Sequence, residues 1–311
     1  MIKAVKKSYS MNLKNKFDII IFHQKDAILN YSAIRFLFFI YIFFLLLLYK
    51  NIWTQFPEKY PYLVSHTGLF ALYHFTTPHL IFILNLTCAL ALLVAFGFGG
   101  RIIIALCCAG FFLLNSQPQA YNTLAALNTP ISFFSFIFLF SPVCSPLKFI
   151  KNRSVVQKYS SSDYSWPIFY GRFLHAFFFF FPAVSKLYSS GISWLRNDTL
   201  KFIILCSPFR VGGDNISGDY SLNFVRNFSQ NYFMNSNVVF SVAAIIVIML
   251  ELLAPVCLFS NKFKKIIIPL LAVFQICIYY SLLIPPFRSI PGYLFWIDWK
   301  YILQLFKKNR A

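Results

Sequence analysis

The chain has 311 residues, of which 59% are hydrophobic and 12% are charged, and its mean hydropathy is +0.65. Soluble domains carry about 25% charged residues, so this composition excludes an ordinary soluble domain and predicts an integral membrane protein. The formal net charge is +19, but the Lys and Arg residues lie mostly between apolar runs and at the termini. Because they do not alternate with aromatic residues over one surface, they indicate membrane topology and exclude a nucleic-acid-binding surface.

Seven apolar segments predict membrane-spanning helices, because a helix needs about 20 residues to cross the apolar layer of a bilayer. In chain order they cover residues 32–50, 79–98, 102–115, 127–150, 167–188, 237–260 and 263–284. The third segment is short for a span. The first segment follows a lysine-rich stretch and has no small-residue cleavage site, so we expect a retained span rather than a signal peptide.

Residues 293–306 are ambiguous, because Asp298 and Lys300 lie between Trp296, Trp299 and Tyr301. This mixture is typical of a helix at the membrane interface, but an eighth span is also open. The predicted fold class is therefore all-α: a polytopic transmembrane helix bundle of about seven spans plus an interfacial or eighth C-terminal helix. We expect a basic cytoplasmic tail at residues 1–31, a transmembrane domain at 32–306 and a basic tail at 307–311.

Lys and Arg in the short loops predict the orientation of the protein. Loops rich in these residues face the cytoplasm, and here they cluster in the N-terminal stretch, at residues 148–158 and at residues 262–265. These segments all fall on one side of a seven-span bundle. We therefore expect a multi-pass protein of the cell membrane with a cytoplasmic N-terminus. Basic residues after 306 favour a cytoplasmic C-terminus, which would require the eighth span.

Ionisable residues inside spans are costly and are candidates for function. The fifth segment carries Arg172, His175 and Lys186, and at 100° per residue His175 and Lys186 differ in direction by only about 20°. They lie about 16 Å apart along the helix axis. For Arg172 and Lys186 the alternative is that their long side chains reach the lipid headgroups, and for His175 it is a packing role.

Glu251 is the only acidic residue that lies clearly inside a predicted span. A carboxyl group there is either protonated or paired with a cation, and Arg172, His175 and Lys186 are the expected partners. The alternative is a purely structural pair between helices. None of the seven cysteines lies in a CxxC motif or in a Cys/His cluster with metal spacing, so no metal site is predicted, and the sequence names no cofactor.

Three stretches carry motifs of a known family. Residues 95–142 contain a Gly-Phe-x-x-Arg turn followed by two apolar helices, the second of which ends in Pro. Residues 170–200 contain a Tyr-to-Lys helix followed by Lys-Leu and a Trp, and residues 250–275 contain a further matching stretch. The chain thereby resembles the horizontally transferred transmembrane (HTTM) domain family, which is related to the membrane part of vitamin K-dependent γ-carboxylases.

The resemblance implies a role for Lys186, which stands at the Lys-Leu position. In the carboxylases this lysine is taken as the base that deprotonates vitamin K hydroquinone. Removal from water favours the neutral amine, the form that acts as a base. Two departures argue against peptide carboxylation itself: Ser185 stands where the carboxylases have a second Lys, and Gln275 stands near where the family often has His.

Two functions from different classes are open. The first is a membrane enzyme, by resemblance of a carboxylase or epoxidase type, or a maturation factor. It would act on a quinone, lipid or peptide in an extracytoplasmic cavity, with Lys186 as base and His175 or Glu251 assisting. The second is a non-catalytic scaffold or partner subunit of another membrane protein. A transporter is a weaker third hypothesis, because the sequence shows no inverted repeat.

Overall fold

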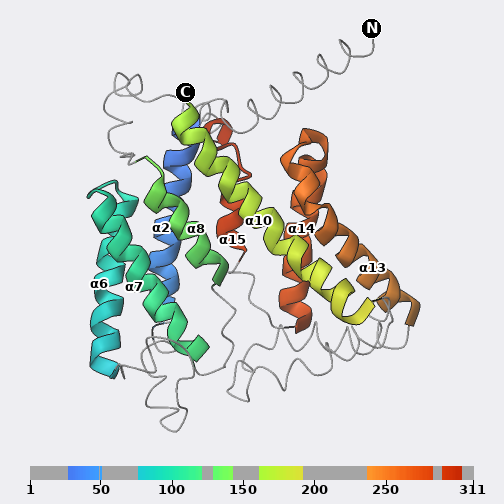
Figure 1. The fold of residues 1–311 in the computed structure, drawn as a ribbon, viewed down its shortest axis with the longest axis horizontal. Coiled ribbons are helices and arrows are strands. Elements are labelled where there is room, and N and C mark those ends of the chain that lie inside the picture. Colours follow the sequence, from blue (N-terminus) through green and yellow to red (C-terminus); the bar gives the residue numbers. More distant parts are fainter. Residues whose placement is uncertain are drawn as a thin grey trace, which may run out of the picture. The chain divides into compact units, whose positions relative to one another are not determined.

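The computed structural model of the protein describes residues 27–48, 50, 76–120, 129–142, 161–191, 237–282 and 289–302. Every element in these ranges is helical (Figure 1), which confirms the all-α prediction. In chain order the elements are α2 (Ala27–Leu48), α6 (Thr77–Ala95), α7 (Arg101–Ala120), α8 (Thr129–Phe140), α10 (Ser161–Ser190), α13 (Asn237–Leu253), the 3₁₀ helix η5 (Ala254–Leu258), α14 (Asn261–Leu282) and α15 (Ile290–Leu294).

Four helices are long and apolar enough to cross a membrane, namely Ala27–Leu48, Thr77–Ala95, Ser162–Ser189 and Ser241–Leu258. They match the first, second, fifth and sixth predicted spans. Two shorter apolar helices lie in the third and fourth predicted spans, and α14 lies in the seventh. The total of about seven spans stays a prediction, as does the orientation. Most of the predicted N-terminal tail and all of the predicted C-terminal tail lie outside the described residues.

Several helix ends differ from the prediction; α10, for example, begins at Ser161 rather than at residue 167. Helix α2 begins at Ala27, before the predicted start at residue 32, and α7 continues to Ala120 rather than ending at residue 115. Helix α8 has 12 residues and ends at Phe140, because Pro142 has no N–H with which to continue a helix. The remainder of the predicted fourth span, residues 143–150, lies outside the described residues.

The chain divides into two compact units. Unit 1 comprises Met1–Arg172 and Pro291–Ala311, and unit 2 comprises Phe173–Ile290. The boundary falls inside α10, which is one continuous helix, so no change in composition marks it in the sequence. The predicted transmembrane domain at 32–306 therefore contains residues of both units.

Close helix contacts in unit 1 depend on small residues. Helix α6 packs against both α2 and α7, and α7 packs against α8. A tight turn joins α6 to α7, and in it Gly97 and Gly99 have φ angles of 81° and 86°, which favour glycine. A Cβ atom at Gly110 of α7 would lie 2.2 Å from the hydroxyl oxygen of Thr87 on α6. Small residues that allow such an approach are common between membrane helices.

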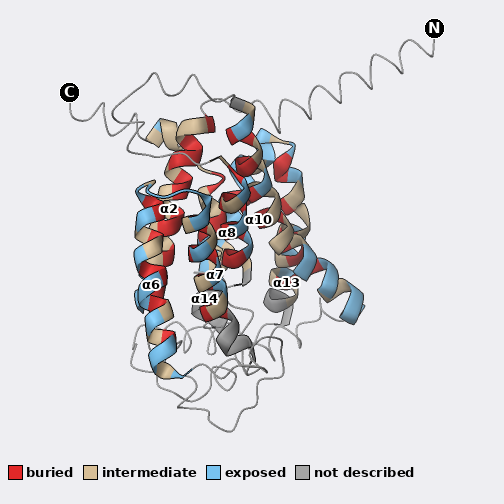
Figure 2. Cartoon of the chain, turned by 60° about the vertical axis from the view of Figure 1, so that its left-hand side comes forward, coloured by how far each residue is buried: buried red, intermediate tan, exposed pale blue. Residues whose placement is uncertain are grey.

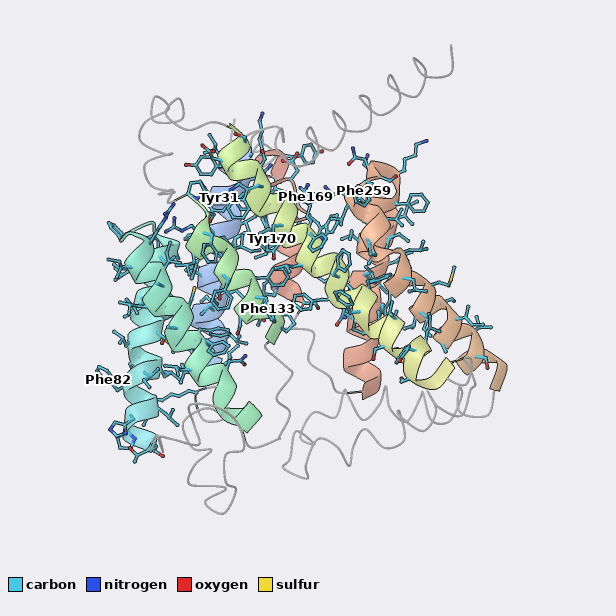
Figure 3. The ribbon with its side chains drawn as sticks, viewed as in Figure 1. Tyr31, Phe82, Phe133, Phe169, Tyr170 and Phe259 are labelled. Carbon is cyan, nitrogen blue, oxygen red and sulfur yellow. The ribbon has the colours of Figure 1, made fainter. Side chains whose placement is uncertain are left out.

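Large apolar side chains lie on the outer faces of the described helices. Figure 2 shows exposed positions along α6 and α13, and Figure 3 shows Phe82 at the outer edge of α6. The Phe82 side chain is 67% exposed, and Phe133 and Tyr170 are also exposed. So many exposed apolar residues would be unfavourable in water, whereas lipid chains can cover them. This surface supports the assignment to the integral membrane proteins.

The C-terminal stretch is not one helix from residue 293 onward. Helix α15 ends at Leu294, residues 295–298 form a turn, and a second helical turn follows at 299–302. The indole N–H of Trp299 donates to the Leu294 carbonyl oxygen at 2.9 Å, and the backbone N–H of Lys300 donates to Oδ1 of Asn30 at 3.1 Å. The described part of this stretch is therefore a broken segment bonded to α2, rather than a continuous eighth helix.

Phe295 anchors this broken segment in the core of unit 1. It is fully buried, and its ring centroid lies 5.6 Å from that of Phe134 and 6.2 Å from that of Phe138 on α8. Phe138 in turn packs on Phe38 of α2. Gly171 of α10 lies directly against Phe295, because a Cβ atom there would be 2.2 Å from the Phe295 ring. The glycine thus makes room for the aromatic anchor.

Replacing Gly171 by Val should displace Phe295 and lower the free energy of unfolding by about 1–3 kcal/mol, the usual effect of overpacking a core. Thermal unfolding in detergent micelles measures this loss. Gly100→Val is the matched control, because nothing lies within 4 Å of a Cβ atom built there. Equal unfolding midpoints for the two variants would contradict the packing of Phe295 against α10.

Candidate functional site

Lys186 and Glu251 form an ion pair in unit 2, between α10 and α13. The ammonium group of Lys186 donates to both carboxylate oxygens of Glu251, at 2.9 Å to Oε1 and 2.7 Å to Oε2. The Glu251 side chain is 6% exposed and the Lys186 side chain 24%. The Glu251 side chain is therefore buried, while the Lys186 side chain is partly exposed. The sequence predicted three possible cationic partners for Glu251, and in the structure its partner is Lys186.

Each of the two residues has a buried neighbour one turn earlier on its own helix. On α10 the buried Ala183 precedes Lys186 by three residues, and on α13 the buried Ile248 precedes Glu251 by three. Residues three apart share one face of a helix. Helix α13 ends shortly after Glu251 and continues as η5, which has a Pro at its start. The carboxylate thus belongs to the last α-helical turn before a proline changes the helix type.

His175 also lies in unit 2, but its contacts differ from those of Lys186 and Glu251. It is buried, its ring contacts Phe179 edge-on at a centroid distance of 5.1 Å, and it hydrogen-bonds the backbone of Ser289. Eleven residues separate His175 from Lys186, which is about 16 Å along a helix axis. Although the two residues share one side of α10, His175 is therefore too far along the helix to contact the ammonium group. These contacts are typical of a buried packing residue, and an assisting role for His175 stays a prediction.

Arg172 contacts the C-terminal segment of unit 1. Its Nε–H donates to the carbonyl oxygen of Phe295 at 2.7 Å, and its guanidinium carbon lies 5.8 Å from the ring centre of Trp296, within the range of a cation–π contact. Asp298 interacts with it electrostatically. The three ionisable residues of α10 therefore have different partners. Arg172 contacts a backbone carbonyl, His175 contacts the backbone of Ser289, and Lys186 contacts a carboxylate.

Arg35 is a buried cation that the sequence analysis did not single out. It lies on α2 in unit 1, and its exposure is 0%. With a helix expected from residue 32, Arg35 stands in the first turn, where a long side chain reaches the headgroups. The helix begins at Ala27 instead, so Arg35 stands in the third turn. The signal in the sequence was an arginine inside an apolar run. Because the helix was expected to start at residue 32, Arg35 was placed near the end of the helix rather than deep inside it.

The paired amine and carboxyl group can exchange a proton. In the ion pair the proton belongs to Nζ, and its transfer to an oxygen of Glu251 would leave a neutral amine beside a neutral acid. Because both carboxylate oxygens lie within hydrogen-bonding distance of Nζ, the proton can pass directly between the two side chains. Within the described ranges, no group of three His, Cys, Asp or Glu side chains is arranged to hold a metal ion.

Comparison of the chain with protein-family models, with curated proteins and with solved structures gives no match. The similarity to the HTTM family therefore rests on the sequence motifs quoted above. The ion pair of Lys186 and Glu251 is an independent observation about two residues of those stretches.

Proposed function

We propose that this integral membrane protein is an enzyme or maturation factor of the HTTM type, in which Lys186 is the base and Glu251 exchanges a proton with it. The ion pair is the observation that carries the proposal. Placing a carboxylate in an apolar helix is costly, and the Lys186 side chain beside it is 24% exposed, so that a substrate can reach it. The substrate is a quinone in its hydroquinone form, a lipid or a peptide that presents an acidic proton to Lys186.

The proposed reaction begins with the pair in its charged form. The N–H bond at Nζ breaks, an O–H bond forms on Glu251, and both side chains become neutral. The amine of Lys186 then takes a proton from the substrate, so the ammonium group is restored beside the substrate anion. As the product leaves, Glu251 gives its proton to the product anion or to water, which restores the starting ion pair with Lys186. No oxidant or reductant is consumed by these residues.

A non-catalytic role is the second candidate, and one observation favours it. Both oxygens of Glu251 accept from the same ammonium group, which is also how an ion pair holds two helices together. In that case the chain is a scaffold or a partner subunit. The two candidates differ in whether Lys186 must be a lysine or only one half of a charge pair.

Reactivity of the Lys186 amine tests the catalytic proposal directly. A succinimidyl ester acylates neutral amines, and mass spectrometry after proteolysis measures the rate at each lysine. Glu251→Gln should raise the rate at Lys186 about tenfold, because the variant removes the carboxylate that favours the charged form. Lys262 and Lys265 of α14 provide internal controls, since both are exposed and should react at the same rate in both proteins. No acylation of Lys186 in either protein would show that reagents cannot reach it and would overturn the catalytic proposal.

Charge exchange separates the two candidates. Lys186→Met should lower the free energy of unfolding by up to about 3 kcal/mol, because it leaves a buried carboxylate without its cation. The doubly substituted protein Lys186→Glu/Glu251→Lys should recover most of this stability. Complementation of a deletion strain then gives the functional readout. A catalytic role predicts that the exchanged protein is stable and inactive, whereas full complementation supports the scaffold.

A further inference from the structure

The turn between α13 and α14 carries a concentrated positive charge. It follows Leu258, the last residue of a helix long and apolar enough to span a membrane, and three lysines lie in the first turn of α14: Lys262, Lys264 and Lys265. Within the described residues of unit 2 the one acidic residue is Glu251, and Lys186 neutralises it. The described residues of unit 2 therefore provide no acidic side chain beyond Glu251 to neutralise Lys262 and Lys265.

An exposed apolar stripe begins at the same turn. Phe263, Ile266, Leu270 and Val273 of α14 are each between 44% and 60% exposed, and their spacing of three, four and three residues places them on one face of the helix. Phe259, in the turn itself, is also exposed and is labelled in Figure 3. The stripe thus continues from the charged turn along the helix.

The two features have a definite relative position. Lys262 and Lys265 are three residues apart and share one side of the first turn, and Lys262 precedes the first residue of the stripe, Phe263. The Ser260 hydroxyl accepts a hydrogen bond from the backbone N–H of Phe263 at 3.4 Å, which fixes where the helix starts. A ligand that fits both features has an anionic head and an apolar tail.

We propose that this surface binds an anionic phospholipid, with its phosphate on Lys262 and Lys265 and its acyl chain along the stripe from Phe263 to Val273. Lysines beside a span attract anionic lipids, each contributing about 1 kcal/mol near the membrane surface. The apolar stripe distinguishes this ligand from a nucleic acid or a soluble anion, which would leave the stripe uncovered. The site is separate from the Lys186–Glu251 pair, so it stands or falls independently of the proposed function.

Native mass spectrometry of the purified full chain in detergent tests the site. Phosphatidylglycerol and phosphatidylcholine with identical acyl chains are titrated against the protein, and the wild type should retain phosphatidylglycerol preferentially. Lys262→Gln/Lys265→Gln should reduce the affinity for phosphatidylglycerol about tenfold. Lys262→Arg/Lys265→Arg keeps the charge and should bind as the wild type does. Arg101→Gln, which removes an exposed cation at the start of α7, is the matched control and should change nothing.

Three results would overturn the proposal. One is equal retention of the two lipids by the wild type, and another is an unchanged affinity in the double Gln variant. The third is full displacement of phosphatidylglycerol by millimolar inorganic phosphate, which would identify a phosphate site without a lipid tail. Equal thermal midpoints for the wild type and the double Gln variant establish that lost binding is not caused by unfolding.

Discussion

The central constraint on this protein is that an apolar environment cannot solvate a charge. A buried ion has to find its partner within the chain, because leaving it alone costs several kcal/mol. Lys186 and Glu251 meet this requirement with two short hydrogen bonds, and Arg172 meets it with a backbone carbonyl and an aromatic face. Each of these contacts joins elements that are distant in the sequence, so the same requirement also contributes to the tertiary structure.

The positions of the helices along the sequence were largely predictable from composition and hydropathy. Long apolar runs give helices because a helix satisfies its own backbone hydrogen bonds, and the first, second, fifth and sixth predicted spans appear as helices of suitable length. Helix ends were less predictable, since they depend on capping and on prolines such as Pro142. The turn at residues 295–298 could not be foreseen, because it depends on packing of Phe295 against Gly171 and α8.

The candidate site was predictable in its members but not in its pairing. The rule that charges inside spans have a function or a partner singled out Lys186, His175 and Glu251. Helical periodicity placed Arg172, His175 and Lys186 toward one side of the same helix. It carries no information about which residues of other helices each of them contacts. The structure gives these residues different partners, and the one that pairs with Glu251 is Lys186. Pairing between distant segments requires tertiary structure, which periodicity along one helix does not encode.

The chemistry proposed for the pair requires that Glu251 is ionised at rest and that Lys186 holds the proton. Infrared difference spectroscopy between the wild type and Glu251→Gln, at neutral pH in lipid nanodiscs, measures the protonation state of this one carboxyl group. The account predicts that the substitution removes a band of an ionised carboxylate. Loss of a protonated carboxylic acid band instead would show that the two side chains do not form an ion pair, and would contradict the account.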